Sequence, residues 1–341
     1  MSAYTIRDIA RLAGVSVTTV SRVLNHRPDV NEQTRKAVER VIAECHFVGN
    51  RNARGLKQSR DAIGLIVRGR SNPFLSALAE AILEHAKSLP DYVLTEYIDE
   101  ADDEFLTALH MSQQTRIRGF IFVGSRIDDR AKVLENMEVP LVFTTVNGRA
   151  ASFRRASSVA IDDRAMGRAV AEAMLSAGHR NIAVFGSDPL AGDSLSARFQ
   201  GFCDAFTDQG LIFMPSWYRV TRFSLQAGYD AALSFFADHP EMTALFAMSD
   251  TVALGAMRAL QDLGKNVPSD LSVVGFDGID LGRFTAPRLT TVEQPVEEIA
   301  RQSIHLLLDM MEKNASPRHL LVSASFRRRE SLAAPPSSPA G

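Results

Sequence analysis

Residues 5–25 read TIRDIARLAGVSVTTVSRVLN, and this stretch encodes two short helices joined by a glycine turn. Thr5 and Asp8 fit a capping box, in which a first-turn acid bonds back to the N-cap residue. Gly14 stands where the first helix must stop, because glycine adopts the left-handed conformation at little cost. Ser16 is then a suitable N-cap for a second helix. The pattern predicts a helix-turn-helix unit.

The second helix is expected to run from Val17 to about Leu24, and a third from about Asn31 to Glu44. One face of the second helix is apolar and suits a miniature core, whereas the opposite face is small and polar. The N-terminal part of such a helix can enter the major groove of DNA. A merely solvated helix face is the alternative, but such faces are usually rich in Glu and Lys instead of Ser and Thr.

Residues 5–25, together with VNEQTR at 30–35, resemble the head of the LacI/GalR (lactose/galactose repressor) family of transcriptional regulators. The resemblance implies that the second helix reads operator DNA. Residues 17 and 18 vary within that family and set operator preference. The DNA-binding residues predicted in this head are Thr5, Ser16, Val17, Thr18, Ser21, Arg22 and Asn25.

Residues 49–60, GNRNARGLKQSR, are polar and basic with one large apolar residue, as in an interdomain linker. The resemblance implies a more specific role as a hinge helix that forms on operator DNA. In that reading Leu56, flanked by Ala53 and Lys57, wedges into a base step of the minor groove. Gly55 costs such a helix about 1 kcal/mol relative to alanine, so we expect it to be unstable without DNA.

Charge is divided unevenly along the 341 residues. Residues 1–60 contain 11 Lys/Arg against 5 Asp/Glu, whereas the remaining 281 contain 27 against 35. This division suggests that only the basic head meets a polyanion. No apolar run approaches the ~20 residues that span a bilayer, and the first residues lack a signal-peptide pattern. Cys45 and Cys203 have no metal-type spacing, so we expect a cytoplasmic protein with reduced thiols, no metal, no cofactor and no membrane partner.

From residue 61 onward, apolar strand-like runs alternate with helical stretches such as 74–87 and 104–114. The runs are 62–67, 92–97, 119–123, 140–144, 181–185, 244–247 and 271–276. Continuous β-branched and aromatic runs between helices indicate an α/β fold with parallel sheets covered on both faces. About 280 residues suit two sheets better than one.

The resemblance also covers this body, which is similar to periplasmic sugar-binding proteins with two doubly wound lobes around a ligand. It implies a helix-turn-helix domain at 1–48, a hinge at 49–60 and an effector-binding and dimerisation domain at 61–330. One lobe would comprise about 61–162 and 294–327, and the other about 163–293. The chain would cross between lobes near Asp162, near Glu293 and in a final strand at 320–327. Residues 331–341, rich in Ala, Pro and Ser, are predicted to be a disordered tail.

Ligands of doubly wound sheets lie beyond the carboxyl ends of the strands. Arg198 matches the family's effector-contacting arginine, and Asp277 can accept two sugar hydroxyl bonds. Phe74 can stack on a sugar ring or a purine. The full set of effector-binding candidates is Phe74, Asp163, Arg198, Phe223, Ser249, Asp277 and Gln294. Each has an alternative structural role as an ion-pair partner, helix cap or core residue.

Motifs of nucleotide-binding, serine-hydrolase and metalloprotease sites are absent, so the sequence does not favour an enzyme. We predict a homodimeric, sequence-specific transcriptional repressor that binds a near-palindromic operator and a small effector, a sugar or sugar derivative. Alternatives are a purine- or nucleoside-responsive regulator and a sugar-binding receptor. A dimer is favoured over a tetramer because the tail has no apolar heptads.

Overall fold

The computed structural model describes residues 10–24, 31–44, 61–127, 134, 137–148 and 155–336, without the side chains of residues 21, 24 and 42–44. The chain divides into two compact units, 1–59 and 60–341, so the division falls within one residue of the end of the predicted hinge. None of the helices in these ranges is long and apolar enough to cross a membrane.

In the smaller unit, α2 (Val17–Leu24) and α3 (Glu32–Glu44) occupy the ranges predicted for the second and third helices. The turn before α2 contains Gly14 at φ +66°, and the amide of Val15 donates to the carbonyl of Ala10 at 3.0 Å. The core is built from small and β-branched side chains, namely Ala10, Val20, Val23 and Val38. This packing holds the two helices of the motif against α3.

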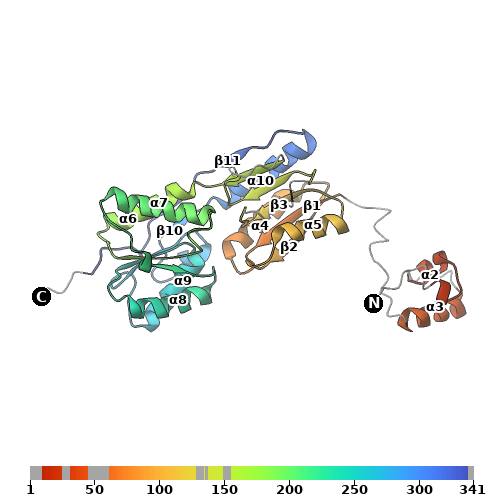
Figure 1. The fold of residues 1–341 in the computed structure, drawn as a ribbon, viewed down its shortest axis with the longest axis horizontal. Helices are drawn as coiled ribbons and strands as arrows, with labels where there is room; N and C mark the ends of the chain where they lie inside the picture. Colours follow the sequence, from red (N-terminus) through yellow and green to blue (C-terminus); the bar gives the residue numbers. More distant parts are fainter. Residues whose placement is uncertain are drawn as a thin grey trace. The chain divides into compact units, whose positions relative to one another are not determined.

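The first lobe of the larger unit, where Figure 1 labels β1, β2, β3 and β11, contains a six-stranded parallel sheet. Its strand order is β11-β5-β4-β3-β1-β2. Its strands are β1 (Ala62–Arg68), β2 (Tyr92–Ile98), β3 (Ile117–Val123), β4 (Leu141–Thr144), β5 (Ala156–Ala160) and β11 (His319–Leu321). Side chains of β1 alternate between the two faces. One face packs against α4 (Pro73–Ala86) and α10 (Val296–Glu312), and the other packs against α5 (Glu104–Gln114).

The second lobe contains a four-stranded parallel sheet with the order β7-β6-β8-β9. Its strands are β6 (Ile182–Gly186), β7 (Tyr218–Val220), β8 (Ala244–Ala247) and β9 (Ser272–Val274). One face is covered by α6 (Asp163–Ser176) and α7 (Ser194–Asp208), and the other by α8 (Leu225–Asp238) and α9 (Asp250–Asp262). The prediction of two parallel sheets, each covered on both faces, is therefore confirmed.

Three segments connect the lobes, at 161–162, 294–295 and 322–324. The last of these corrects the predicted final strand at 320–327. That stretch forms two short strands, β11 in the first lobe and β12 (Ser325–Arg327), which pairs antiparallel with β10 (Thr291–Glu293). The first lobe therefore ends near residue 321 instead of 327, because residues 322–324 carry the chain back to the second lobe.

The structure also corrects the predicted disordered tail, because residues 331–336 pack against the second lobe. The hydroxyl of Ser331 donates to the carbonyl of Val273 at 2.5 Å and accepts from the amide of Thr290 at 2.8 Å. Leu332 is buried in the core that the side chains of α6 and α7 form with the sheet of the second lobe. The carbonyl of Ala333 bonds to the ring of His179 at 2.9 Å. Composition alone suggested disorder, but the partners of these residues lie far away in the sequence.

Three strands of the described part of the chain, β5, β7 and β10, were not predicted. The β5 sequence ASSVA contains two serines that are buried, with their hydroxyls bonded to other elements. Ser157 accepts from the amide of Arg318 at 3.0 Å, and Ser158 bonds to His319 at 2.9 Å. The β7 strand has only three residues and lies at the edge of its sheet. None of the three carries the continuous apolar run from which the longer strands were predicted.

Candidate functional site

A pocket of about 480 Å³ lies between the two lobes of the larger unit. Its walls come from the segments that follow the strands β1, β2, β3 and β4 in one lobe and β6, β7, β8 and β9 in the other. The strands of each sheet are parallel, so their carboxyl ends lie along one edge of that sheet, and the pocket is lined by the segments that leave these two edges. The predicted candidates in its lining are Phe74, Arg198, Phe223, Asp277 and Gln294.

Arg198 projects from α7 and is buried at the base of the pocket. Its Nε and Nη2 atoms donate to one carboxylate oxygen of Asp163 at 3.1 and 2.7 Å, and its Nη1 donates to the carbonyl of Met248 at 2.6 Å. The guanidinium also lies over the ring of Phe276, 3.3 Å from the centroid. A guanidinium has five N–H donors, so two are left for a ligand.

Asp277 lies at the end of the segment after β9, with its backbone at φ +113°. Its carboxylate accepts from Nε2 of Gln294 at 2.9 Å, and its amide donates to the carbonyl of Val292 at 2.9 Å. Burial raises the pKa of Asp277 to about 6, against the opposing effects of Arg198 and Gln294. The carboxyl that faces the pocket is therefore tied directly to the second connection between the lobes.

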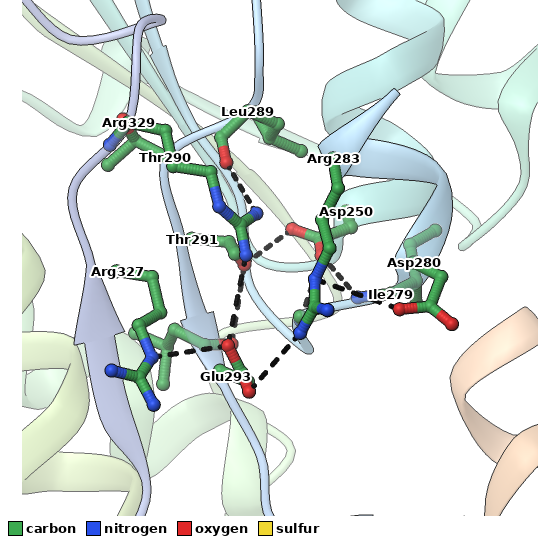
Figure 2. Close-up of polar contacts among 12 residues, drawn as sticks. Asp250, Ile279, Asp280, Arg283, Leu289, Thr290, Thr291, Glu293, Arg327 and Arg329 are labelled. Carbon is green, nitrogen blue, oxygen red and sulfur yellow. Dashed lines mark hydrogen bonds and ion pairs between the residues drawn. The ribbon is translucent and has the colours of Figure 1, made fainter. Parts of the chain in front are cut away.

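Asp250 holds the turn that carries Asp277. Its carboxylate accepts from the amides of Gly278 and Ile279, both at 2.8 Å, and from the hydroxyl of Thr291 at 2.6 Å (Figure 2). Burial and the neighbouring Asp277 raise the pKa of Asp250 to about 8, although these three donors lower it. The turn and the strand β10 are thus fastened to the same side chain.

Glu293, the last residue of β10, is surrounded by three arginines (Figure 2). Its carboxylate lies 3.2 Å from Arg327, 3.5 Å from Arg283 and 3.8 Å from Arg329. Arg329 also donates to the carbonyl of Leu289 at 2.9 Å. These contacts fix β10 and β12 to the second lobe up to the point where residues 294–295 leave it.

The aromatic candidates provide apolar walls from both lobes. Phe74 is the second residue of α4. Its amide donates at 3.0 Å to Oδ1 of Asn72, the N-cap residue of that helix. Phe223 follows β7 and is half-buried against the core of the second lobe. Both residues line the pocket, in places that suit contact with the apolar face of a ring.

Two candidates are buried but do not line the pocket. Asp163 is the partner of Arg198, and burial raises its pKa although the guanidinium opposes this. Ser249 caps α9 by accepting from the amide of Thr251 at 3.3 Å. The structure places both as supports for neighbouring residues.

Sequence reasoning missed two serines that line the pocket. Ser125 follows β3 and Ser187 follows β6, and the hydroxyl of each is buried. Within the described part of the chain, neither hydroxyl has a hydrogen-bond partner. Buried hydroxyls are costly without a partner, so both are available to bond a polar ligand that enters the pocket. Both follow strands that the sequence predicts, and this was the signal that could have identified them.

The position of Arg198 depends on a close contact between α6 and α7. A Cβ atom added at Gly167 would lie 1.9 Å from the carbonyl oxygen of Arg198, and one at Gly201 would lie 1.9 Å from that of Arg164. The two helices therefore touch along their backbones, and only glycine permits that approach.

Gly167→Ala is expected to lower the free energy of unfolding by about 1–3 kcal/mol, because the helices must separate. Alanine is a better helix former than glycine by about 1 kcal/mol, which opposes this loss of stability. The variant is therefore less stable only if the cost of separating the helices is larger than that gain. Urea unfolding followed by the fluorescence of Trp217, the single tryptophan of the chain, measures the change. Ala165→Ser, on the exposed face of α6, is the control. A stabilised Gly167→Ala variant would show that the contact is not tight.

The smaller unit presents the residues that were predicted to bind DNA. Val17, Thr18 and Arg22 are exposed on α2, whereas Val20 and Val23 are buried. Ser16 begins the helix by accepting from the amide of Thr19 at 3.1 Å. Thr5, Asn25, Ala53, Leu56 and Lys57 lie outside the described residues, as does the side chain of Ser21.

Two family models match the chain. Residues 5–50 match "Bacterial regulatory proteins, lacI family", and residues 171–332 match "Periplasmic binding protein-like domain". The HTH-type transcriptional regulator MalR of Clostridium butyricum is 30% identical over 333 residues, which cover 96% of this chain and 98% of MalR.

Solved structures also resemble this chain along almost its whole length. A transcriptional regulator CelR–cellobiose complex has a TM-score of 0.72 and 26% identity, with 96% of this chain and 99% of that chain covered. The lac repressor dimer bound to operator and the anti-inducer ONPF has a TM-score of 0.68 and 26% identity, covering 98% and 100%. Both likenesses extend over the head and the body of this chain.

Proposed function

This chain belongs to the lacI family of bacterial regulatory proteins, and on that premise we propose a homodimeric repressor controlled by an uncharged carbohydrate in the interlobe pocket. The chain is a helix-turn-helix transcriptional regulator, as its relatives are. The proposal concerns its ligand, its assembly and the residues that bind DNA.

The polar groups of the pocket suit a ligand with several hydroxyls. Arg198 retains two N–H donors, and the carboxylate of Asp277 can accept from a hydroxyl. The unpartnered hydroxyls of Ser125 and Ser187 can each donate and accept. Phe74 adds an apolar wall, as in most small-molecule sites. These unpartnered hydroxyls are the observation that carries the proposal.

The charges around the pocket favour a neutral ligand over a phosphorylated one. The arginines in the lining are Arg68, Arg126, Arg198 and Arg222, and the carboxylates are Glu100, Asp193 and Asp277. Three more carboxylates, those of Asp99, Glu104 and Asp163, are ion-paired to these arginines from behind the lining. Counted together, these groups are six carboxylates and four guanidinium groups, and this net negative charge around the pocket disfavours a phosphate.

A thermal-shift comparison of neutral and charged compounds tests the ligand class. Cellobiose, D-ribose and D-glucose are compared with glucose 6-phosphate and inosine. A ligand at 100 times its Kd stabilises the folded chain by about 2.7 kcal/mol. We expect stabilisation by a neutral sugar. Stabilisation by glucose 6-phosphate alone contradicts the proposal. Stabilisation by inosine alone also contradicts it and shows that the ligand is a nucleoside instead of a carbohydrate.

On the DNA side, we propose that the exposed Val17, Thr18 and Arg22 read base edges of a near-palindromic operator. The likeness to the lac repressor dimer bound to operator, which covers 98% of this chain, supports operator binding by this chain. We also propose that Leu56 wedges into the centre of the operator, although it lies outside the described residues. Two copies are needed because one marginal hinge helix would not offset the cost of bending DNA.

Arg22→Ala is expected to weaken binding to an operator, selected from random duplexes, by about 10- to 100-fold. Its binding to unrelated duplexes should fall much less. Arg301→Ala removes an exposed arginine of α10 and is the control. Equal losses on both kinds of duplex would show that Arg22 contacts only the backbone. Failure to select any sequence with the unaltered chain would contradict the proposed operator binding.

A further inference from the structure

An ion pair joins the two lobes across the rim of the pocket. Nη2 of Arg222 lies 2.7 and 3.0 Å from the two carboxylate oxygens of Asp99, and Nε lies 3.7 Å from the carboxylate of Glu100. Arg222 follows β7 in the second lobe, whereas Asp99 and Glu100 follow β2 in the first lobe. The pair is therefore a contact that exists only while the lobes are close together.

The order of the strands places this pair far from the connections between the lobes. In the first lobe, two of the connections leave from β5 and β11, at one edge of the sheet, while β2 is the opposite edge. In the second lobe, the chain leaves from β10 and β12 beyond β9, while β7 is the opposite edge. A rotation about the connections therefore separates the ends of β2 and β7 most.

Both partners are held by their own loops. Oδ1 of Asp99 accepts from the amide of Ala101 at 3.1 Å. The amide of Asp99 donates to the carboxylate of Asp102 at 2.9 Å. The carbonyl of Arg222 accepts from the amide of Ser224 at 3.1 Å. The backbone bond from Ala101 and the charge of Arg222 lower the pKa of Asp99, so the carboxylate is ionised throughout the neutral range.

The same loops form the rim through which a ligand must pass. Glu100 and Ala101 line the pocket on one side, and Thr221, Arg222 and Phe223 line it on the other. We propose that Arg222 and Asp99 form a latch that closes this rim and must break when a ligand enters or leaves. The inference rests on the proposed function only in taking this pocket as the ligand site.

The exposure of the pair suits a reversible latch. The side chains are 65% and 53% exposed, so the pair is screened by water and salt. Exposed pairs of this kind shift an equilibrium by at most about fivefold. The latch therefore favours the closed form without preventing opening, and its effect decreases as ionic strength rises.

Distance measurements between spin labels test the latch without DNA or ligand. The full chain carries labels at Gln113→Cys in α5 and Ser234→Cys in α8, with Cys45 and Cys203 replaced by serine, and is diluted with unlabelled chain. Arg222→Gln should raise the population at long distances up to about fivefold. High salt should have the same effect on the unaltered chain.

Two further variants make the result specific. Arg164→Gln removes an exposed pair of the same length, 2.7 Å to Asp204, that lies within one lobe, and it should change nothing. Arg222→Lys keeps the positive charge beside Asp99 and Glu100, and it should retain more of the short distances than Arg222→Gln. An unchanged distribution for Arg222→Gln, or equal opening in Arg222→Lys and Arg222→Gln, would overturn the latch. Neither outcome depends on whether the ligand is a carbohydrate.

Discussion

Arg198→Met is expected to lower the free energy of unfolding by about 3–5 kcal/mol, because it leaves the buried carboxylate of Asp163 without its partner. The side chains of both residues are less than one-tenth exposed, so water cannot replace the lost charge. Methionine retains most of the packing, which isolates the electrostatic effect. Urea unfolding followed by Trp217 fluorescence measures the loss in the second lobe.

The loss should increase with pH. Burial already raises the pKa of Asp163, and removing the guanidinium raises it further. A carboxyl with a raised folded-state pKa stabilises the fold only below its unfolded pKa of 3.8, and that stabilisation is lost as the pH rises. The difference between Arg198→Met and the unaltered chain should therefore be smaller at pH 4.5 than at pH 8.

The double variant Arg198→Met with Asp163→Asn is the matched control, because it removes the unpaired charge as well. It should unfold at a higher urea concentration than Arg198→Met alone and depend less on pH, although Asp277, whose pKa Arg198 also lowers, still titrates. If the single variant is as stable as the unaltered chain, the pair is not as buried as described.

Deletion of residues 331–341 is expected to lower the free energy of unfolding by about 5 kcal/mol or more. The deletion removes the buried side chain of Leu332, and large-to-small changes at such sites cost about 2–5 kcal/mol. It also leaves the amide of Thr290 and the buried Ser272 without partners from the tail. Each buried polar group left unpaired adds about 1–3 kcal/mol.

Such a loss corresponds to a fall in Tm of about 10–20 °C for a domain of this size. Differential scanning calorimetry measures it directly. Truncation after Pro336 keeps the contacts of Ser331 and Leu332 and is the control. A deletion of 331–341 that melts at the same temperature as this control would show that these contacts do not stabilise the second lobe.

The sequence alone determined the architecture and the placement of most elements. Gly14 and the spacing of Val20 and Val23 marked the helix-turn-helix, and alternating apolar runs marked the two parallel sheets. These features are local, because the periodicity of a helix or a strand is expressed within a dozen neighbouring residues. The rule that ligands bind at the carboxyl ends of parallel strands then pointed to Asp277. Arg198 was identified through the resemblance to the LacI/GalR family.

Only the tertiary structure decided which of those residues face the pocket and which support it. Asp163 and Arg198 are 35 residues apart, and Asp99 and Arg222 are 123 apart, so neither pair leaves a local signal. The packing of residues 331–336 likewise depends on hydrogen bonds to His179, Ser272 and Thr290, which are distant in the sequence. Burial and pairing arise between segments that are distant in sequence. Composition and periodicity report the secondary structure of a segment, but not its distant partners.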